Sequence, residues 1–325
     1  MSSPAVAAGI GFLFSVLFLL LIRPAARRWS FLTSKEVPSI GGISMGLALL
    51  MGLLLTGPFF SSLSREAMGL LIASAVMLVA GIFDDHKELS VAQKFWVQLF
   101  AAAILIAFGV RTNFFNVGEP LNLVISVLWI IGITNAMNLL DVMDGLAGGV
   151  ALVILSGFCV LSCMSGDSLT LGFSCVLAGS VLGFWIFNVP PAQVYMGNSG
   201  SHFLGLVLAA ISLTGRYATP DRAVALLTPV LVLGFPILDT LFLIWVRVRK
   251  GRSAFNKSED HMALRFLKKG YSKRKTLVVM MGWTLFFVLT GMVLGRGSHP
   301  FAVLALVLAG LGSLFLIKDM ERVKI

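Results

Sequence analysis

Residues 121–146 read LNLVISVLWIIGITNAMNLLDVMDGL, an apolar run over 121–137 that passes directly into a polar stripe. A helix needs roughly 17 to 25 apolar residues to cross the hydrocarbon of a bilayer, and this run is long enough. Such runs recur along the chain, whose 325 residues are 58% hydrophobic and 12% charged, with a mean hydropathy of +0.95. Soluble domains are nearer roughly 45–50% apolar and 25% charged. We therefore predict an all-α, polytopic integral membrane bundle that forms one domain over 1–325.

Eleven apolar windows can be drawn as transmembrane helices. They cover 5–22, 40–57, 67–83, 95–110, 121–137, 146–164, 169–187, 202–214, 224–246, 276–294 and 300–317. The windows 95–110 and 202–214 are short, so we expect their helices to begin inside the preceding polar loops. The first window has no basic segment before it and no A-x-A cleavage pattern after it, which favours a retained helix over a signal peptide.

The loops between these windows differ in charge, and the difference predicts an orientation. One alternating set of loops holds 5 of the 25 Lys and Arg residues, and the other set holds the remaining 20. The positive-inside rule assigns the basic set to the cytoplasm, with the N-terminus outside and the C-terminus inside. The cytoplasmic loops are then 23–39, 84–94, 138–145, 188–201 and 247–275. The net charge of +10 thus reflects topology, and nucleic-acid binding is excluded.

Two acidic pairs lie at cytoplasmic ends of the predicted helices. Asp84 and Asp85 close the third window, where a solvated helix end and a cation site are both reasonable interpretations. Asp141 and Asp144 are three residues apart and share one helical face, with Asn138 a turn earlier. A polar stripe inside an apolar run must find partners and is more often functional than structural. Mg²⁺ uses one or two carboxylates together with substrate phosphates.

Three further features have both structural and functional interpretations. Gly197 and Gly200, within 188–201, would let backbone N–H groups approach an anion, but they also suit an ordinary turn. Segment 247–275 holds eleven Lys and Arg residues, which suits anionic lipid or a multiply charged phosphate substrate. Asp239, inside the window 224–246, is a functional candidate or a structural partner of another helix. The three cysteines lie in apolar runs and are expected to be small buried hydrophobes.

Taken together, these pieces resemble the polyprenyl-phosphate N-acetylhexosamine-1-phosphate transferases, the glycosyltransferase family 4 enzymes that include phospho-N-acetylmuramoyl-pentapeptide transferase. Five motifs carry the resemblance in order along nearly the whole chain. They are Lys35-Glu36-Val37-Pro38-Ser39-Ile40-Gly41-Gly42, Asp84-Asp85 with Leu89-Ser90 and Lys94, Asn135-x-x-Asn138-x-x-Asp141-x-x-Asp144-Gly145-Leu146, Asn188 through Ser201, and Pro236-x-x-Asp239-Thr240.

The resemblance implies an enzyme of the bacterial cytoplasmic (inner) membrane. It would transfer a hexosamine 1-phosphate from a UDP-amino sugar to undecaprenyl phosphate, release UMP and so begin a lipid-linked envelope glycan. Mg²⁺ is the implied cofactor, with Mn²⁺ as the alternative, and a homodimer is an open possibility. The implied partners are these two substrates and membrane lipid.

The resemblance also implies roles for individual residues. The catalytic residues are Asp84, Asp85 and Asp144, and the metal ligands are the same three with Asn198. The substrate-binding residues are Lys35 and Lys94 for phosphate, Asn188 and Tyr195 for the uracil ring, Asn138 and Asp141 in the nucleotide site, and His261 and Arg265 in the basic segment.

Two departures from the family pattern bear on these roles. Asn198 stands where the family usually has an aspartate that resembles a direct metal ligand. The family's His-x-His-His pattern is here His261-Met262-Ala263-Leu264, and Ser258 replaces an expected aspartate. We therefore expect a donor other than plain UDP-N-acetylglucosamine, or weaker selectivity for it. The alternative functions are a catalytically reduced binding or scaffold subunit and, less favoured because we find no internal repeat, a secondary transporter.

Overall fold

The computed structural model describes residues 3–28, 33–34, 37–56, 64–114, 117–217, 223–253 and 260–323. Thirteen α-helices form in these residues: α1 (Pro4–Arg28), α2 (Gly41–Leu55), α3 (Arg65–His86), α4 (Val91–Ala107), α5 (Glu119–Leu140), α6 (Leu146–Ser165), α7 (Ser168–Asn188), α8 (Gly197–Thr214), α9 (Thr228–Val232), α10 (Gly234–Arg249), α11 (Met262–Lys268), α12 (Lys273–Arg296) and α13 (His299–Glu321). A 3₁₀ helix, η2 (Ala223–Leu227), precedes α9, and β1 (Thr33–Ser34) pairs antiparallel with β2 (Val37–Pro38). Apart from this hairpin, the all-α prediction is confirmed.

Each predicted window contains helix, but not every helix has the length of a membrane span. Within the described residues, seven helices are long and apolar enough to cross a membrane, namely α1, α3, α5, α6, α7, α12 and α13. The bent pair α9–α10 would be an eighth, while α2 and α4 are shorter apolar helices. As expected, α4 and α8 begin earlier than their apolar windows. A membrane protein is supported, and the count of eleven crossings stays a prediction.

The window 224–246 does not form the single helix that we expected. Its two parts, Val224–Val232 and Gly234–Arg249, meet at an angle of 72°. Pro236 lies in the first turn of α10 and has no N–H to donate to the carbonyl group of Val232, so the helical hydrogen bonds are interrupted at this junction. The sequence interpretation is corrected to a broken span or a re-entrant segment.

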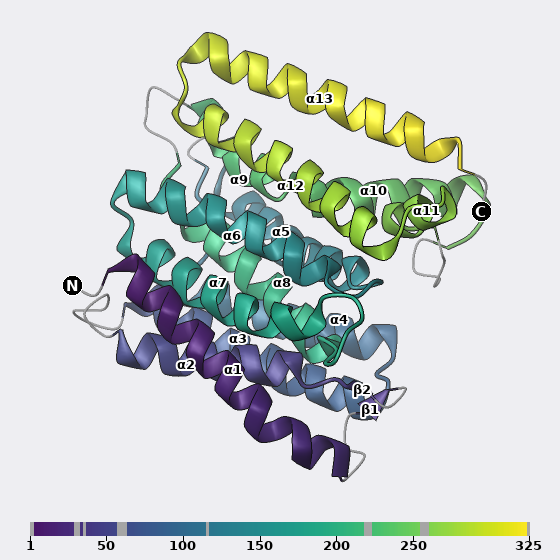
Figure 1. The fold of residues 1–325 in the computed structure, drawn as a ribbon. Coiled ribbons are helices and arrows are strands. Elements are labelled where there is room, and N and C mark those ends of the chain that lie inside the picture. The colour runs from purple at the N-terminus through teal and green to yellow at the C-terminus, as the bar shows by residue number, and fades with distance from the viewer. Residues whose placement is uncertain are drawn as a thin grey trace.

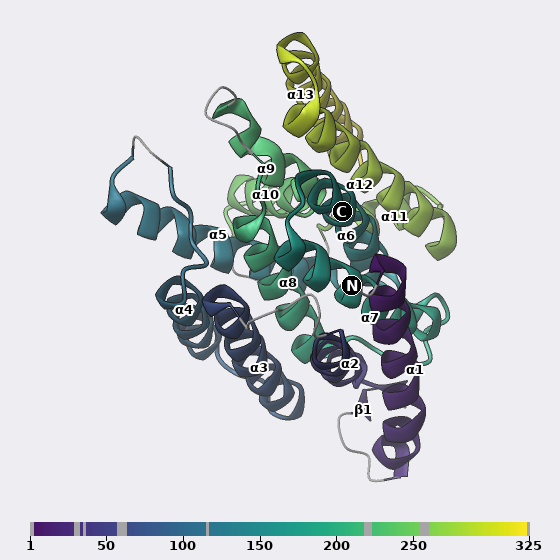
Figure 2. The same cartoon turned by 90° about the vertical axis from the view of Figure 1, so that its left-hand side faces the viewer.

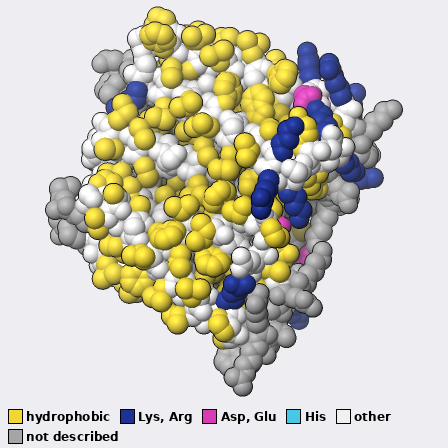
Figure 3. Space-filling model, in the orientation of Figure 1, with side chains coloured by type: hydrophobic (Ala, Val, Ile, Leu, Met, Phe, Trp, Pro, Cys, Tyr) yellow, Lys and Arg dark blue, Asp and Glu magenta, His cyan; other side chains and the backbone are white. Residues whose placement is uncertain are grey.

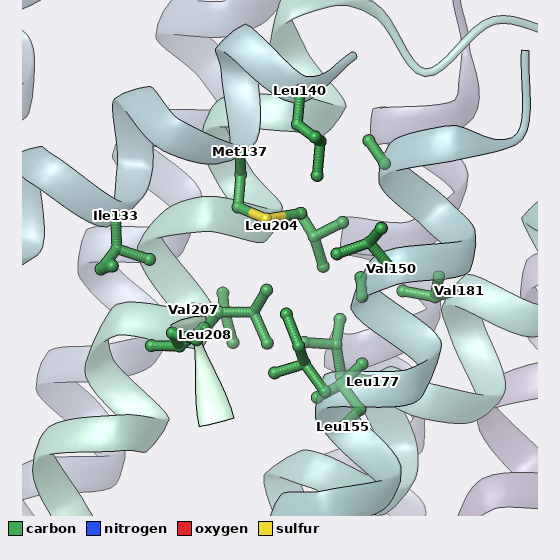
Figure 4. Close-up of a cluster of buried hydrophobic side chains, with 14 of the residues drawn as sticks. Ile133, Met137, Leu140, Val150, Leu155, Leu177, Val181, Leu204, Val207 and Leu208 are labelled. Carbon is green, nitrogen blue, oxygen red and sulfur yellow. The ribbon is translucent and has the colours of Figure 1, made fainter. Parts of the chain in front are cut away.

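Helix α8 lies at the centre of the bundle. Every residue from Ser199 to Ser212 is buried, and α2, α3, α5, α6 and α7 all pack against this helix (Figures 1 and 2). Figure 4 shows Leu204, Val207 and Leu208 of α8 in a cluster with side chains from α5, α6 and α7. This packing fixes the first turn of α8 relative to the ends of α3 and α5, where the predicted site residues lie.

The surface of the bundle has an apolar middle and a basic end. Large hydrophobic side chains are exposed along the outer faces of the helices, and Figure 3 shows them as a broad yellow area. Lys and Arg gather at the right-hand end of the same view, where α10 ends and α12 begins. The N- and C-termini lie at opposite ends of the bundle (Figure 1). Which end faces the cytoplasm stays a prediction.

Candidate active site

A polar cavity of about 570 Å³ lies where α3 and α5 end and α8 begins. Five carboxylates, two side-chain amides and one aromatic ring line it: Asp84, Asp85, Glu88, Asp141, Asp144, Asn188, Asn198 and Tyr195. These residues come from 84–94, 138–145 and 188–201, three loops that the charge pattern assigned to one side of the membrane. The cavity is therefore strongly acidic and is assembled from segments that are distant in sequence.

Asp85 joins the end of α3 to the beginning of α8. Its two carboxylate oxygens accept hydrogen bonds from the backbone N–H groups of Asn198 (2.6 Å) and Ser199 (3.0 Å). The first N–H groups of a helix have no partner inside the helix and carry partial positive charge, so a carboxylate stabilises them. Asp85 thus caps the central helix and at the same time lines the cavity.

Two glycines permit this close approach. A Cβ atom on Gly81 of α3 would meet the backbone of Ser199, so only glycine lets the two helices come this close. Gly197 has a φ angle of +74°, and a Cβ atom there would lie 2.6 Å from the carboxylate of Asp85. Both positions therefore favour glycine for geometric reasons. The two glycines therefore determine how closely Asp85 approaches the start of α8, which the acidic pair in the sequence does not indicate.

Asp84 also lines the cavity, but it is buried and its carboxylate contacts the segment that leads into α4. One carboxylate oxygen accepts a hydrogen bond from the backbone N–H of Leu89 (2.7 Å), and the other lies 2.7 Å from Nζ of Lys94. Lys94 is held in the first turn of α4, which Ser90 and Gln93 begin with a reciprocal pair of hydrogen bonds. The adjacent aspartates therefore have different partners, a lysine for Asp84 and a helix N-terminus for Asp85.

Asp141 and Asp144 lie on the turn between α5 and α6. The carboxylate of Asp141 forms no hydrogen bond or ion pair with any residue that the structure describes. Burial of this group, reinforced by the negative charges of Asp85 and Asp144, raises the pKa of Asp141 to about 7. Asp144 lies 3.3 Å from Nζ of Lys273, a largely exposed pair that contributes little energy. Asp141 is thus the uncompensated charge of the cavity.

Three amides hold the loops around the cavity. Asn138 donates to the side-chain oxygens of Asn198 (3.2 Å) and Ser201 (2.9 Å). Asn188 accepts from the backbone N–H of Gly145 (2.9 Å) and donates to the carbonyl group of Val194 (2.8 Å). The bonds of Asn138 tie α5 to the start of α8, and those of Asn188 tie the end of α7 to the turn after α5 and to the loop before α8. Asn188, which the sequence predicts to bind uracil, therefore already uses its side-chain oxygen and nitrogen in hydrogen bonds that hold the fold.

Tyr195 lines the cavity, and its backbone is bound to the N-terminal part of the chain. Its N–H donates to the carbonyl group of Pro38 in β2 (2.9 Å), and its carbonyl group accepts from the N–H of Gly41 in α2 (3.0 Å). Lys35, which the sequence predicts to bind phosphate, lies outside the described residues. The first motif of the resemblance, 35–42, nevertheless reaches the site through Pro38 and Gly41.

The structure does not bring His261 and Arg265 to this cavity. His261 is buried and its Nδ1 lies 3.6 Å from Asp239, whose other oxygen accepts from the backbone N–H of Met262 (3.1 Å). Arg265 is buried in a separate cluster, where it contacts Asp260 and the backbone of Met320. The substrate-binding roles of His261 and Arg265 stay predictions, and Asp239 has the structural pairing that the sequence left open.

Three residues near the site were not singled out in the sequence. Glu88 lines the cavity, Lys273 faces Asp144, and His202 is buried in α8 beside Asp84 and Lys94. Glu88 lies only three residues beyond Asp85 and could have been found from its place in the same loop. Lys273 was one of eleven basic residues, and His202 stood inside an apolar window, so neither could be distinguished by pattern.

Comparisons with known proteins identify the family. A family model described as glycosyl transferase family 4 matches residues 67–216, the part from α3 to α8 that holds every aspartate of the cavity. A Bacillus subtilis protein named probable undecaprenyl-phosphate N-acetylglucosaminyl 1-phosphate transferase is 31% identical over 305 residues, which cover 88% of this chain and 84% of the relative. The chain belongs to glycosyl transferase family 4. The predicted family and the prediction of a phosphotransferase enzyme are confirmed.

Two other relatives show the range of names within the family. A decaprenyl-phosphate N-acetylglucosaminephosphotransferase from Mycobacterium tuberculosis is 33% identical over 76% of this chain and 69% of its own length. A phospho-N-acetylmuramoyl-pentapeptide-transferase from Staphylococcus carnosus is 28% identical over 63% of this chain and 74% of its own length. Members therefore differ in the sugar and in the polyprenyl phosphate that their names give.

Proposed function

We propose that this protein transfers an N-acetylhexosamine 1-phosphate from a UDP-sugar to undecaprenyl phosphate at the cytoplasmic face of the bacterial inner membrane. UMP is released, and the product begins a lipid-linked envelope glycan. The observation that carries the proposal is the acidic cavity, in which the ends of α3 and α5 meet the start of α8 within the part of the chain that matches the family. The names of the relatives support a polyprenyl phosphate acceptor and an amino-sugar donor.

The donor set of the cavity suits Mg²⁺ when substrate phosphates complete the coordination. Among the described residues, no three His, Cys, Asp or Glu side chains lie close enough together to hold a metal ion by themselves. Mg²⁺ commonly binds through one or two carboxylates and the phosphates of its substrate. Asp141, which lacks a partner and is crowded by Asp85 and Asp144, is the carboxylate most suited to this role. Asp144 and the side-chain oxygen of Asn198 are the neighbouring ligands; Mn²⁺ would use the same groups.

The reaction then follows from the charges around the cavity. An oxygen of undecaprenyl phosphate forms a bond to the β-phosphorus of the UDP-sugar, and the bond between this phosphorus and the bridging oxygen of UMP breaks. We assign Lys94 to the lipid phosphate, for which it would exchange its contact with Asp84 for one with the phosphate. A divalent cation bound here supplies neutralisation of the developing negative charge. Catalysis by the protein is therefore mainly positioning and electrostatic stabilisation.

The decisive experiment is transfer by the purified protein. Radiolabelled UDP-N-acetylhexosamines are incubated one at a time with undecaprenyl phosphate and Mg²⁺, and lipid-linked product is separated and counted. The proposed transferase forms product with at least one donor, and we expect a donor other than UDP-N-acetylglucosamine, or several donors, to be accepted. A scaffold subunit would bind substrates without forming product. Absence of product with every donor, beside an active relative as control, would contradict the proposal.

The proposed orientation can be tested at the loop before α8. Met196 in this loop is buried, whereas Gln193 is exposed and suits labelling. In a background without the three native cysteines, Gln193→Cys in intact cells should resist a membrane-impermeant thiol reagent and should react after the membrane is opened. Labelling from outside would overturn the cytoplasmic assignment of the cavity.

A further inference from the structure

His202 lies in the second turn of α8 and is only 4% exposed. Its Nδ1 atom is 2.9 Å from the backbone carbonyl oxygen of Asn198. A carbonyl oxygen can only accept a hydrogen bond, so Nδ1 carries the proton and donates it. In a neutral imidazole the other nitrogen, Nε2, is then an acceptor. Nε2 forms no hydrogen bond with any residue in the described parts of the chain.

The imidazole shares a small cavity with the pair formed by Asp84 and Lys94. This cavity has a volume of about 20 Å³, and its remaining walls are mainly apolar side chains of α3 and α4. A volume of at least roughly 10–15 Å³ is needed for one water molecule. The cavity is therefore large enough for one water molecule and too small for a larger ligand. Asp84, Lys94 and His202 are the charged or titratable groups on its wall.

The donors and acceptors on this wall are not balanced. One oxygen of Asp84 accepts a hydrogen bond from the backbone N–H of Leu89, and the other lies 2.7 Å from Nζ of Lys94 in an ion pair. The ammonium group of Lys94 has three donors, and Asp84 is its one ion-pair partner among the described residues. An acceptor without a donor and an ammonium group with spare donors thus face the same small cavity. A buried polar group without a partner costs free energy, which pairing them would remove.

We propose that His202 is a positioning residue, whose Nε2 accepts a hydrogen bond from Lys94, directly or through one water molecule. This bond restrains the ammonium group of Lys94 from a second side. The ammonium group therefore stays beside the acidic cavity when the acceptor phosphate replaces Asp84 as its partner. This inference rests on the proposed function, because it assigns His202 to binding of the polyprenyl phosphate and not of the nucleotide sugar.

Two substitutions separate this role from a structural one. In His202→Asn the amide nitrogen can occupy the place of Nδ1 and keep the bond to the carbonyl group of Asn198, but nothing replaces Nε2. In His202→Gln the longer side chain places a polar group near Nε2 and gives up the bond to Asn198. The proposal predicts that His202→Asn raises the KM for undecaprenyl phosphate about tenfold, as for loss of one hydrogen bond to a charged group. The KM for the donor should not change, and His202→Gln should stay near wild type.

The opposite ranking, with His202→Asn near wild type and His202→Gln impaired, would assign His202 to holding the turn and overturn the proposal. Combining His202→Asn with Lys94→Met should add nothing to the effect of Lys94→Met alone, and an independent effect would also overturn it. Thermal unfolding in detergent checks the fold of each variant. Loss of folded protein in both His202 variants would show a packing role and would likewise refute the assignment.

The same ranking can be measured without catalysis. Binding of radiolabelled undecaprenyl phosphate in the absence of donor should weaken in His202→Asn and persist in His202→Gln. Failure of the transfer assay in the wild-type protein would therefore refute the proposed function, while the binding assay would still decide the role of His202.

Discussion

Acidic groups at two places in this protein are compensated in opposite ways. In the cavity between α3, α5 and α8, Asp141 has no partner among the described residues, and burial together with neighbouring carboxylates raises its pKa to about 7. In the second cluster, burial disfavours the charge of Asp260, but the hydrogen bonds and charges of Lys250 and Arg265 outweigh it and lower the pKa of this carboxyl group. Lys94 and Lys273 face Asp84 and Asp144 in the first cluster but none of the described cations pairs with Asp141, whereas two cations face Asp260 in the second.

The contacts of the second cluster show how complete this compensation is. Asp260 lies 2.7 Å from Nζ of Lys250 and 3.0 Å from Nη2 of Arg265. Arg265 also donates to the carbonyl groups of Met320 (2.8 Å) and Val323 (2.7 Å) at the end of α13. This arginine therefore fastens α11 to the C-terminal helix. An acidic group therefore points to chemistry when its surroundings leave it uncompensated, and to architecture when they satisfy it.

Asp141→Asn should produce the largest change. We expect kcat to fall several hundred-fold, equivalent to about 3–4 kcal/mol, because one preorganised charge is removed from the reacting site. Thermal unfolding without metal should occur at the same or a higher temperature, since the amide relieves repulsion by Asp85 and Asp144. Steady-state kinetics and thermal unfolding in detergent measure both effects.

A matched control for this substitution is Glu119→Gln. Glu119 is an exposed acid in the first turn of α5 that pairs with Arg111, so its loss should change neither activity nor unfolding appreciably. Asp144→Asn should also remove most activity. Near-wild-type turnover in both Asp141→Asn and Asp144→Asn would mean that the acidic cavity is not the reacting site.

Arg265→Met should affect stability more than activity. Removing one partner of a buried pair leaves the other charge uncompensated, and we expect a loss at the lower end of the usual range, about 3 kcal/mol, because Lys250 still faces Asp260. The double variant Asp260→Asn with Arg265→Met should recover part of this loss. The KM values of the folded fraction should match wild type. A raised KM with unchanged stability would instead restore the substrate-binding role that the sequence suggested for Arg265.

Asp85→Asn should combine both kinds of effect. The amide keeps one acceptor oxygen but loses the charge and one of the two hydrogen bonds that cap α8, so we expect a stability loss of about 1–2 kcal/mol. Activity should fall as well, because the carboxylate also lines the cavity. Asp141→Asn serves as the comparison, since it should lose activity without losing stability. Equal stability of the two variants would show that Asp85 does not support the central helix.

The sequence predicted the helices, the family and the residues that line the cavity more accurately than it predicted what those residues do. Apolar runs determine helices directly. Asp141 and Asp144 were expected on one helical face, but they lie in the turn after α5, which still brings both to the cavity. Three loops assigned to one side by their charge do meet at one cavity. The break at Pro236 was missed because a kinked and a straight span have the same apolar composition.

Pairing between distant residues could not be predicted. Asp84 and Asp85 are adjacent in sequence and chemically identical, yet one pairs with Lys94 and the other caps α8, and only the packing of α3 against α8 distinguishes them. Arg265 was expected to bind substrate because it belongs to a basic segment. Its actual partners include carbonyl groups at the end of α13, more than fifty residues away in sequence. No local pattern carries that information.

Asn198→Asp tests the smallest difference, a single charge in the acidic cluster. Asn198 lines the cavity, its side-chain oxygen accepts from Asn138, and its backbone N–H binds Asp85. A carboxylate here keeps the acceptor for Asn138 and adds a negative charge beside Asp141. Because affinity for Mg²⁺ rises with ligand charge, the Mg²⁺ concentration for half-maximal activity should fall several-fold, equivalent to about 1 kcal/mol.

The opposite result would place Asn198 in a site built around the neutral amide. The added carboxylate would then be repelled by Asp85 and Asp141, one pKa of the cluster would rise, and activity would decrease at neutral pH. Parallel Mg²⁺ titrations of wild type and Asn198→Asp distinguish the two cases, with Asn198→Ala as the control for loss of the bond to Asn138. Identical curves for wild type and Asn198→Asp would show that this side chain does not contact the metal. The cation would then depend on Asp141, Asp144 and the substrate phosphates alone.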